Sequence, residues 1–308
     1  MSAPPEKIII EEVASIKGIS EPFVEKDWYV TQVIKKVSEI TYEGFQIIFT
    51  GGTALSKAHN LILRFSEDVD FRVIAPSLRN ESKSKQKKIL SDFKETVIAN
   101  LKTAFQINEN KVFARNGNQF VALEIDYPTL YPRADALRPH ILVEFTVTNL
   151  AIPAIHLPVS SFVCELTRQR PEVASIGCTN PVENASDKLS ALTWRIPNRV
   201  RGQENDNPDI VRHIHDLSIL SDYAIKHAAF RQLVIETIDS DDQRSSKISG
   251  LSLSAKFDIM LGILNRESEY EKEYERFVMG MSYGPDGSVP SFKIAVEKIQ
   301  IMITHILQ

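Results

Sequence analysis

Two short segments, Thr50-Gly51-Gly52-Thr53 and Arg64-Phe65-Ser66-Glu67-Asp68-Val69-Asp70-Phe71, carry the most information about this chain. Side chains alternate along a strand, so Asp68 and Asp70 would share one face, with Cα atoms roughly 6.5–7 Å apart. Such a pair suits carboxylates that reach toward two Mg²⁺ ions. The glycines suit a backbone that must approach a phosphate closely. Together the two segments indicate phosphoryl or nucleotidyl transfer.

The composition is that of an ordinary globular protein. The chain has 308 residues, of which 43% are hydrophobic and 25% are charged, and its formal net charge is −4. This balance excludes wholesale disorder and excludes a globally basic nucleic-acid coat, although a local basic patch remains compatible with it. The length favours two domains over one.

Cysteine usage and the N-terminal segment indicate a cytoplasmic protein. Cys164 and Cys178 form no C-x-x-C pair, which fits a reducing compartment. The first residues are polar and lack the apolar core of a signal peptide. No run approaches the ~20 apolar residues that a membrane-spanning helix needs, so we expect no membrane association.

Hydrophobic periodicity predicts a mixed α/β half followed by a helical half. Asn116-Gly117-Asn118 between two apolar runs is a strong hairpin signal. From about residue 184 the pattern is almost wholly helical, which places a domain boundary near residues 165–185. The predicted helices are 8–16, 23–40, 53–63, 82–101 and 209–223, and the predicted strands are 45–49, 68–74, 111–115, 120–127 and 140–147.

A third acidic ligand is expected from a strand that neighbours Asp68 and Asp70. Glu144 is the candidate, because it stands alone among apolar and β-branched residues, where an acid is costly to bury unless it is paired or bound to a metal. Glu124 and Asp126, on the hairpin strand, are weaker alternatives. In-line displacement of pyrophosphate from a nucleoside triphosphate (NTP) is best served by two divalent ions, Mg²⁺ or Mn²⁺.

Candidate nucleotide-binding residues surround the glycine turn. The backbone at Gly51 and Gly52 and the hydroxyl group of Thr53 would receive the triphosphate. Further candidate phosphate ligands are Ser56, Lys57 and Ser66. For Lys57 a solvated surface position is an equal alternative, and Ser66 could instead only fix the start of the strand.

Four blocks together resemble a known family. They are Glu25-Lys26-Asp27-Trp28-Tyr29-Val30-Thr31, the acidic block at 64–71, Asp187-Lys188-Leu189-Ser190-Ala191-Leu192 with Arg195, and Arg212-His213-Ile214-His215-Asp216-Leu217. The glycine turn before a D-x-D strand resembles the DNA polymerase β-like nucleotidyltransferase superfamily. The four blocks more narrowly resemble the AbiEii/AbiGii toxin family, which includes the MenT-type toxins. One position departs from the family pattern, because His213 replaces the first acid of R-D-x-x-D-L, and no role is carried over to it.

The resemblance implies a fold of the α+β class. Residues 1–170 would form a polymerase-β-like nucleotidyltransferase domain with a mixed sheet and N-terminal helices, and residues 171–308 would form an all-α domain that closes the nucleotide cleft. It also implies a Mg²⁺-dependent nucleotidyltransferase acting as the toxin of a toxin–antitoxin or abortive-infection pair. Such an enzyme would add nucleotides to the 3′ end of tRNA and would have an antitoxin encoded nearby.

The helical half supplies two more candidate catalytic residues. The resemblance implies that Lys188 would neutralise triphosphate charge as a compact ammonium, although without it a solvated lysine on an amphipathic helix is the alternative. Asp216 would act as a base for the attacking hydroxyl or would orient Lys188, with a helix-surface salt bridge as an equal alternative. His213 and His215 are two residues apart and do not face each other on a helix, so a metal site there is unfavourable. Two basic clusters could meet RNA phosphates, or could be solvated helix faces. They are Lys83, Lys85, Lys87 and Lys88, and Arg195, Arg199 and Arg201.

Three rival functions remain open at this point. The acceptor could be a protein or a small molecule instead of RNA. The chain could bind nucleotide or RNA without turnover, or it could transfer the γ-phosphate as a kinase does. The chosen NTP and the oligomeric state are not encoded in any of these patterns.

Overall fold

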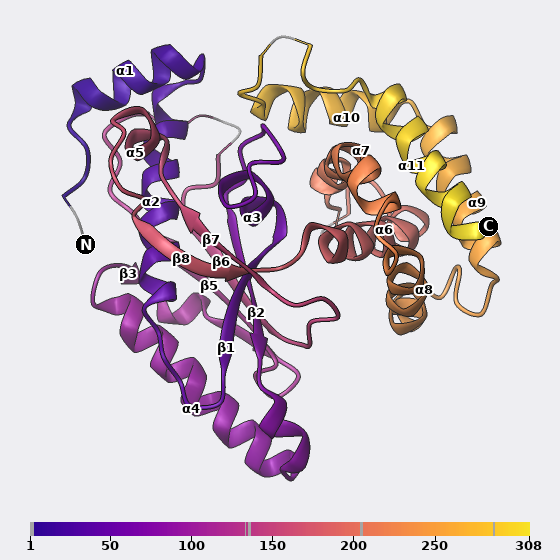
Figure 1. The fold of residues 1–308 in the computed structure, drawn as a ribbon, viewed down its shortest axis with the longest axis horizontal. Coiled ribbons are helices and arrows are strands. Elements are labelled where there is room, and N and C mark those ends of the chain that lie inside the picture. Colours follow the sequence, from indigo (N-terminus) through magenta and orange to yellow (C-terminus); the bar gives the residue numbers. More distant parts are fainter. Residues whose placement is uncertain (1–2, 133, 135–136, 204–205, 286) are drawn as a thin grey trace. The chain divides into compact units, whose positions relative to one another are not determined.

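The computed structural model describes residues 3–132, 134, 137–203, 206–285 and 287–308, and the chain divides into two compact units. The first unit comprises Met1–Asn60 and Phe65–Thr179, and the second comprises Leu61–Arg64 and Asn180–Gln308. The short segment Leu61–Arg64 therefore belongs to the second unit, although its neighbours in sequence on both sides belong to the first. Figure 1 follows the chain through both units by colour.

The first unit is built on one mixed sheet with the order β3-β5-β6-β2-β1-β8-β7, with β4 paired to β5. The pairs β2–β6 and β1–β8 are parallel and the other pairs are antiparallel. The strands are β1 (Gln46–Thr50), β2 (Asp68–Ile74), β3 (Gln106–Ile107), β4 (Phe113–Arg115), β5 (Phe120–Asp126), β6 (Ile141–Val147), β7 (Ile155–Val159) and β8 (Val173–Cys178).

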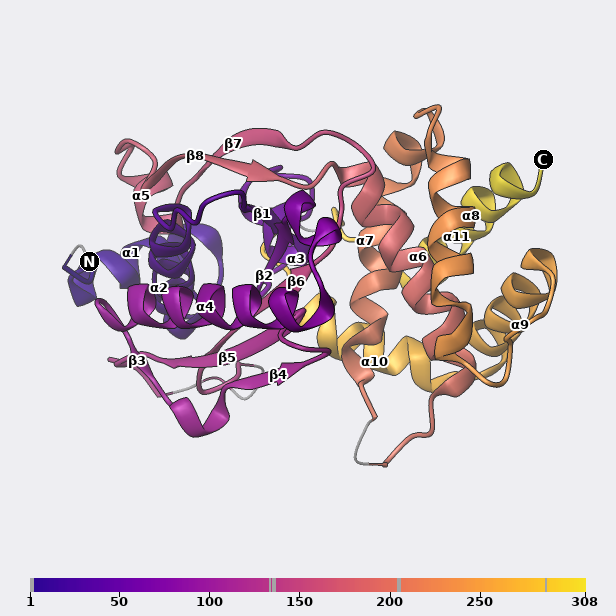
Figure 2. The same ribbon diagram turned by 90° about the horizontal axis from the view of Figure 1, so that it is seen from below.

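One face of this sheet packs into the hydrophobic core. Val69, Phe71 and Val73 of β2 are buried there together with apolar side chains of α2 and α4. Figure 2 shows these two helices beside the sheet. The helices of this unit are α1 (Lys7–Lys17), α2 (Glu21–Ser38), α3 (Gly51–Lys57), α4 (Lys83–Lys102) and α5 (Phe162–Leu166), with 3₁₀ helices η1 (Pro76–Asn80) and η2 (Glu109–Lys111).

The second unit is helical. Helix α7 packs against α6 and α11, and α6 also packs against α8 and α9. The segment Leu61–Arg64 joins this unit by a β-bridge between Arg64 and Ser282, and the Tyr283 N–H donates to the Leu63 carbonyl at 3.0 Å. The helices are α6 (Pro181–Asn198), η3 (Pro208–Ile210), α7 (Val211–Ile225), α8 (Phe230–Asp241), η4 (Asp242–Arg244), α9 (Leu253–Arg266), α10 (Glu269–Phe277), η5 (Met279–Met281) and α11 (Phe292–Leu307).

The α+β fold class expected from the sequence is confirmed, and most predicted elements lie within a few residues of the observed ones. The predicted helix 53–63 is too long, because α3 ends at Lys57 and Leu61–Arg64 leaves for the second unit. Strands β7 and β8 were not predicted. Because β8 pairs with β1 in the sheet, the observed division falls between Thr179 and Asn180, inside the expected range of residues 165–185 but after the expected end of the first domain at residue 170.

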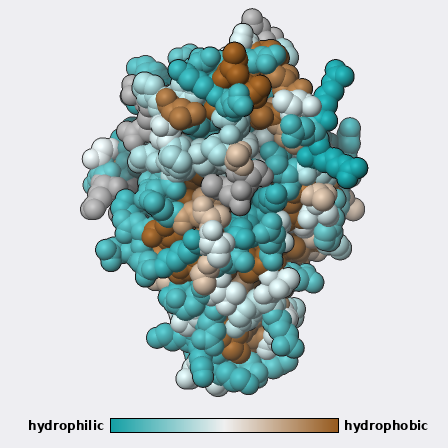
Figure 3. All heavy atoms as spheres, turned by 90° about the vertical axis from the view of Figure 1, so that its left-hand side faces the viewer, coloured by the Kyte–Doolittle hydropathy of each residue, from teal (hydrophilic) through white to brown (hydrophobic). Residues whose placement is uncertain are grey.

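The outer surface of the first unit is mostly hydrophilic when seen from the side of α1, with apolar groups concentrated toward the upper part of the view (Figure 3). Helix α1 contributes two exposed isoleucines, Ile8 and Ile16, at 66% and 60% exposure. Among the residues described, no helix combines the length and apolar character that crossing a bilayer requires.

Candidate active site

Three carboxylates share the half-exposed face of the sheet. Asp70 lies directly opposite Glu144 in the parallel pairing of β2 with β6, and Asp68 lies opposite Leu142. Because partners in register point to the same side, Asp68, Asp70 and Glu144 all lie on the face away from the core. The pairing register of β2 with β6 therefore places Glu144 beside Asp70. The D-x-D spacing alone could not have shown this.

The pKa of Glu144 reflects this crowding of acids. Burial raises the pKa of Glu144, and the nearby charge of Asp68 raises it further. Arg138 and a hydrogen bond with Asp70 act in the opposite direction without reversing the shift. The upward shift in the pKa of Glu144 therefore comes first from its burial and then from the neighbouring acid.

The glycine turn lies against the same carboxylates. Thr50 of β1 pairs with Asp70 of β2, and the next residue, Gly51, has φ +77°, a conformation that L side chains rarely adopt. A Cβ at Gly51 would come within 2.2 Å of Asp70 Oδ2. Glycine is therefore required here both for the backbone conformation and for the space that the Asp70 carboxylate fills.

An arginine outside the predicted site contacts Asp68. Arg138 Nη1 donates to Asp68 Oδ1 at 2.6 Å. The backbone of Arg138 is held on both sides by a buried ion pair, because its N–H donates to Glu67 Oε2 at 2.9 Å and its carbonyl accepts from Lys26 Nζ at 2.8 Å. Lys26 also pairs with Glu67 directly, and both side chains are almost wholly enclosed.

The chemistry of the carboxylates fits a divalent cation, but the side chains do not form a finished cage. Oxygen ligands from Asp68, Asp70 and Glu144 are the type that Mg²⁺ prefers. In the described part of the chain, however, no three His, Cys, Asp or Glu side chains are grouped closely enough to hold a metal ion. One oxygen of Asp68 is bound by Arg138. Of the alternative acids, Glu124 is engaged elsewhere, since it pairs with Lys111 and with His140.

The hydroxyl groups near the turn have mostly structural partners. Thr53 Oγ1 donates to the backbone carbonyl of Asp68, which ties α3 to β2, and the Thr53 side chain is buried. Ser56 Oγ donates to the Thr53 carbonyl at 3.2 Å and is also buried. Ser66 is half-buried just before β2. The expected phosphate contacts from Thr53 and Ser56 would need these hydrogen bonds to be exchanged.

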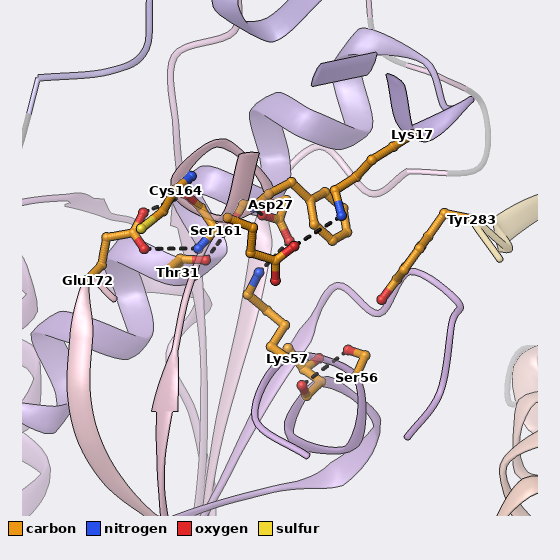
Figure 4. Close-up of polar contacts among 12 residues, drawn as sticks. Lys17, Asp27, Thr31, Ser56, Lys57, Ser161, Cys164, Glu172 and Tyr283 are labelled. Carbon is orange, nitrogen blue, oxygen red and sulfur yellow. Dashed lines mark hydrogen bonds and ion pairs between the residues drawn. The ribbon is translucent and has the colours of Figure 1, made fainter. Parts of the chain in front are cut away.

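Lys57 is part of a second buried ion pair. Its ammonium donates to Asp27 Oδ1, and Asp27 Oδ2 accepts from the Phe162 N–H at 2.7 Å (Figure 4). The two side chains are only 5% and 3% exposed. The alternative of a solvated surface residue is therefore wrong for Lys57, which is a buried cation that joins α3 to α2. Its role as a phosphate ligand stays a prediction, and phosphate binding there would require the ion pair with Asp27 to be exchanged.

The second unit contains a separate cluster around Asp216, whose side chain is fully buried. Arg64 donates to both carboxylate oxygens, Nε to Oδ1 at 2.8 Å and Nη2 to Oδ2 at 2.7 Å. Lys188 Nζ lies 2.9 Å from Oδ2, and His215 Nδ1 lies 3.1 Å from Oδ1. One carboxylate therefore holds two cations that come from distant parts of the sequence.

These cations control the ionisation of Asp216. Burial by itself would raise its pKa, but Arg64 and Lys188 outweigh burial and lower the pKa of Asp216 well below its usual value. A carboxylate that binds protons so weakly is a poor proton acceptor at neutral pH. The geometry therefore favours the second of the two predicted roles for Asp216, the orientation of Lys188.

The comparisons with known proteins show the family of this chain. A family model described as nucleotidyl transferase AbiEii toxin, Type IV TA system, matches residues 43–298, which include both clusters. The chain belongs to this AbiEii toxin family. It is thus a nucleotidyltransferase of a toxin family, and membership implies an NTP substrate and a cognate antitoxin.

A solved structure shares the AbiEii toxin fold seen here. MenT4, nucleotidyltransferase toxin Rv2826c from Mycobacterium tuberculosis H37Rv, is similar with a TM-score of 0.53 and 15% sequence identity. The match covers 97% of this chain and 98% of that chain. A comparison with curated proteins finds no match.

The structure gives a physical reason for several of the AbiEii-like blocks. Lys26 and Asp27 of the first block are the buried partners of Glu67 and Lys57, so they hold the acidic block and the glycine-turn helix in place. Arg64 of the acidic block binds Asp216. His213 is half-buried one turn before Asp216, and its Nδ1 is enclosed without a hydrogen-bond partner.

The two basic clusters differ in this AbiEii toxin. The four lysines at the start of α4 are all exposed. The Arg199 side chain is 6% exposed and binds Asp206 and Glu273, and Arg201 binds Glu267 and Glu273. Arg199 and Arg201 are therefore neutralised inside the helical unit, which leaves the lysines of α4 as the better candidates for contacts with an RNA backbone.

Sequence reasoning missed the roles of Glu67, Arg138 and Lys26. A signal for Lys26 was present, because it lies one helical turn before Val30 on a stripe of buried residues, where a charged side chain needs a partner. No comparable signal existed for Arg138. It lies in an irregular segment, and its partner Asp68 is far away in sequence.

Proposed function

We propose that this protein transfers a nucleoside monophosphate from an NTP to the terminal 3′ hydroxyl of tRNA, with release of pyrophosphate. The observation that supports the proposal best is that Asp70 lies in register with Glu144 on the neighbouring strand, while the Asp70 carboxylate lies against the glycine turn. Membership of the toxin family supports the reaction class, and the choice of tRNA rests on the resemblance.

Asp68, Asp70 and Glu144 would hold the divalent cations. Mg²⁺ is the expected ion, and Mn²⁺ should substitute for it because both prefer oxygen ligands. When bound, such ions stabilise negative charge on the attacking and leaving oxygens. The Gly51 turn would let the backbone approach the triphosphate next to these acids.

Lys188 would bind the triphosphate as a point charge. Its ammonium is already fixed by Asp216, and Arg64 supplies the charge that keeps Asp216 ionised. A cation that is oriented before substrate arrives loses less conformational entropy on binding. In this proposal Asp216 is a positioning residue and Lys188 is the phosphate ligand.

The lysines at the start of α4 would meet the RNA backbone. Lys83, Lys87 and Lys88 are exposed on one short stretch of helix, and Lys85 is paired with Glu81. Contacts of this kind bind phosphates without reading bases, so they would set affinity and its dependence on salt.

The test is incubation of purified protein with each labelled NTP, total tRNA and a cell lysate. We expect label in tRNA, one pyrophosphate per transferred nucleotide, and no label with Asp70→Asn. Label in a protein or small-molecule pool would replace the proposed acceptor, and nucleoside diphosphate without pyrophosphate would indicate γ-phosphate transfer. Nucleotide binding without any product would overturn the enzymatic proposal.

A cellular experiment tests the toxin role. Induced expression should arrest growth, and Asp70→Ala should relieve the arrest if chemistry causes it. Co-expression of the neighbouring gene should relieve it as well if that gene encodes the antitoxin. Equal toxicity of wild type and Asp70→Ala would contradict a catalytic origin of the arrest.

A further inference from the structure

The buried ion pair Lys26–Glu67 holds Arg138 beside the carboxylate site. Its backbone N–H and carbonyl are both bound by the Lys26–Glu67 pair, at 2.9 Å to Glu67 Oε2 and 2.8 Å from Lys26 Nζ. Lys26 is wholly buried and Glu67 is 2% exposed. A buried ion pair that binds both the N–H and the carbonyl of one residue fixes the backbone position from which its side chain extends.

The positively charged guanidinium of Arg138 lies beside carboxylates, where a metal ion would also be stabilised. It binds Asp68 Oδ1 at 2.6 Å and lies close enough to Glu144 to lower the pKa of that carboxyl. The side chain is 36% exposed, so part of it is open to solvent while its backbone is held by the buried ion pair. A residue with these properties can exchange one anionic partner for another without any change in its backbone.

The Arg138 guanidinium and a divalent cation would compete for the same carboxylate oxygen. A divalent cation at Asp68 would repel Arg138 and would take the oxygen that Arg138 now binds. A triphosphate beside the same acids offers oxygens that a guanidinium binds in a charge-assisted, bidentate way. Release of Arg138 from Asp68 and capture of a phosphate group are therefore compatible parts of one event.

We propose that Arg138 is a nucleotide-binding residue that neutralises Asp68 before the cation binds and moves to the triphosphate when cation and nucleotide bind. This inference rests on the proposed function, since it assumes a cation and a triphosphate at these acids. The Lys26–Glu67 pair is the positioning element, because it holds the Arg138 backbone in both states.

The experiment measures Mn²⁺ binding without nucleotide, by the loss of the free-ion electron paramagnetic resonance signal, in wild type and Arg138→Gln. We expect Arg138→Gln to bind Mn²⁺ roughly tenfold more tightly, because a competing positive charge has been removed. At saturating Mn²⁺, a non-hydrolysable NTP analogue should bind the same variant roughly tenfold more weakly, because a charged hydrogen-bond donor to phosphate is lost.

Arg115→Gln is the matched control. Arg115 also lowers the pKa of Glu144, but its guanidinium stacks on the Phe120 ring at 4.2 Å and it is exposed on β4. We expect its Mn²⁺ and nucleotide affinities to stay within twofold of wild type. Thermal unfolding of both variants should match wild type, which excludes a folding defect as the cause.

The outcomes separate this inference from the proposed function. Equal Mn²⁺ affinity in wild type and Arg138→Gln would overturn the role of Arg138, while pyrophosphate release by wild type would leave the proposed function intact. An equal gain of Mn²⁺ affinity in Arg115→Gln would also overturn it, because removal of any nearby positive charge would then have the same effect. Absence of Mn²⁺ binding in every form would overturn this inference, and absence of pyrophosphate release by wild type would in addition overturn the proposed function.

Discussion

The Asp70 carboxylate fills the space that a side chain at Gly51 would need, since a Cβ at Gly51 would lie 2.2 Å from Asp70 Oδ2. The turn and the acid come from neighbouring antiparallel strands, β1 and β2, and each restricts what the other can be. A side chain at position 51 would therefore displace the Asp70 carboxylate.

Gly51→Ala should displace the Asp70 carboxylate. We expect Mn²⁺ affinity to fall at least about tenfold, because one ligand is forced out of position, and a cost of about 1–2 kcal/mol in stability from the backbone conformation. Gly18→Ala is the control, since Gly18 has φ +66° and no atom within 4 Å of its Cβ position. If both variants bind Mn²⁺ as wild type does, the close approach has no role in the site.

Lys188→Met should weaken NTP binding. We expect at least a tenfold loss of affinity for a non-hydrolysable analogue, because an oriented ammonium is removed. Lys256→Met provides the control, since Lys256 is also buried in the helical unit but pairs with Asp242. Isothermal titration calorimetry distinguishes the two, and unchanged affinity in Lys188→Met would remove Lys188 from the nucleotide site.

Asp216 should make stability depend on pH in the acidic range. Its folded pKa lies well below the unfolded value of about 3.9, so its contribution is complete above that value and is lost as the pH falls through the folded pKa. Asp216→Asn should cost about 3–5 kcal/mol at pH 7, because Arg64 and Lys188 lose their buried partner.

Urea unfolding between pH 7 and pH 2 checks this prediction. The wild-type midpoint should fall below about pH 4. The variant should lack the part of this decline that Asp216 contributes. Parallel curves for the two proteins would show that Asp216 is not the group whose protonation matters.

The Asp27–Lys57 pair should be structural. Asp27→Asn and Lys57→Met should each destabilise the protein by about 3–5 kcal/mol, because each leaves a buried charge alone. The double variant should recover part of the loss, and the coupling energy from a double-mutant cycle measures it. Strictly additive losses would mean that the pair does not act as a unit, and an NTP-binding defect in the folded double variant would restore Lys57 to the nucleotide site.

The two cysteines should be unreactive in the folded protein at pH 8. Burial raises the pKa of Cys178 to about 12, and burial with the neighbouring Glu172 raises the pKa of Cys164 to about 11. Thiolate is the reactive form, so very little of it is present at this pH. Mass spectrometry after iodoacetamide treatment should find no modification of the native protein and two modifications after unfolding in urea.

Local patterns predicted most of the elements. β2 was predicted at its observed bounds, and the hairpin at Asn116-Gly117-Asn118 joins β4 to β5 through three residues with positive φ. β8 could not be found in the same way, because two of its residues are exposed and the strand is fixed by its pairing with β1 and β7. Pairing with distant strands does not leave a periodic trace in the sequence.

The sequence by itself indicated phosphoryl or nucleotidyl transfer and the face that Asp68 and Asp70 share, because side-chain alternation and the conformational freedom of glycine act over a few residues, and its resemblance to a family narrowed this to nucleotidyl transfer. Only the tertiary structure decided that Glu144 lies beside Asp70, that Arg138 binds Asp68, and that Lys57 is tied to Asp27. Strand register and the pairing of buried charges depend on which distant segments pack together, and that is set by the whole core.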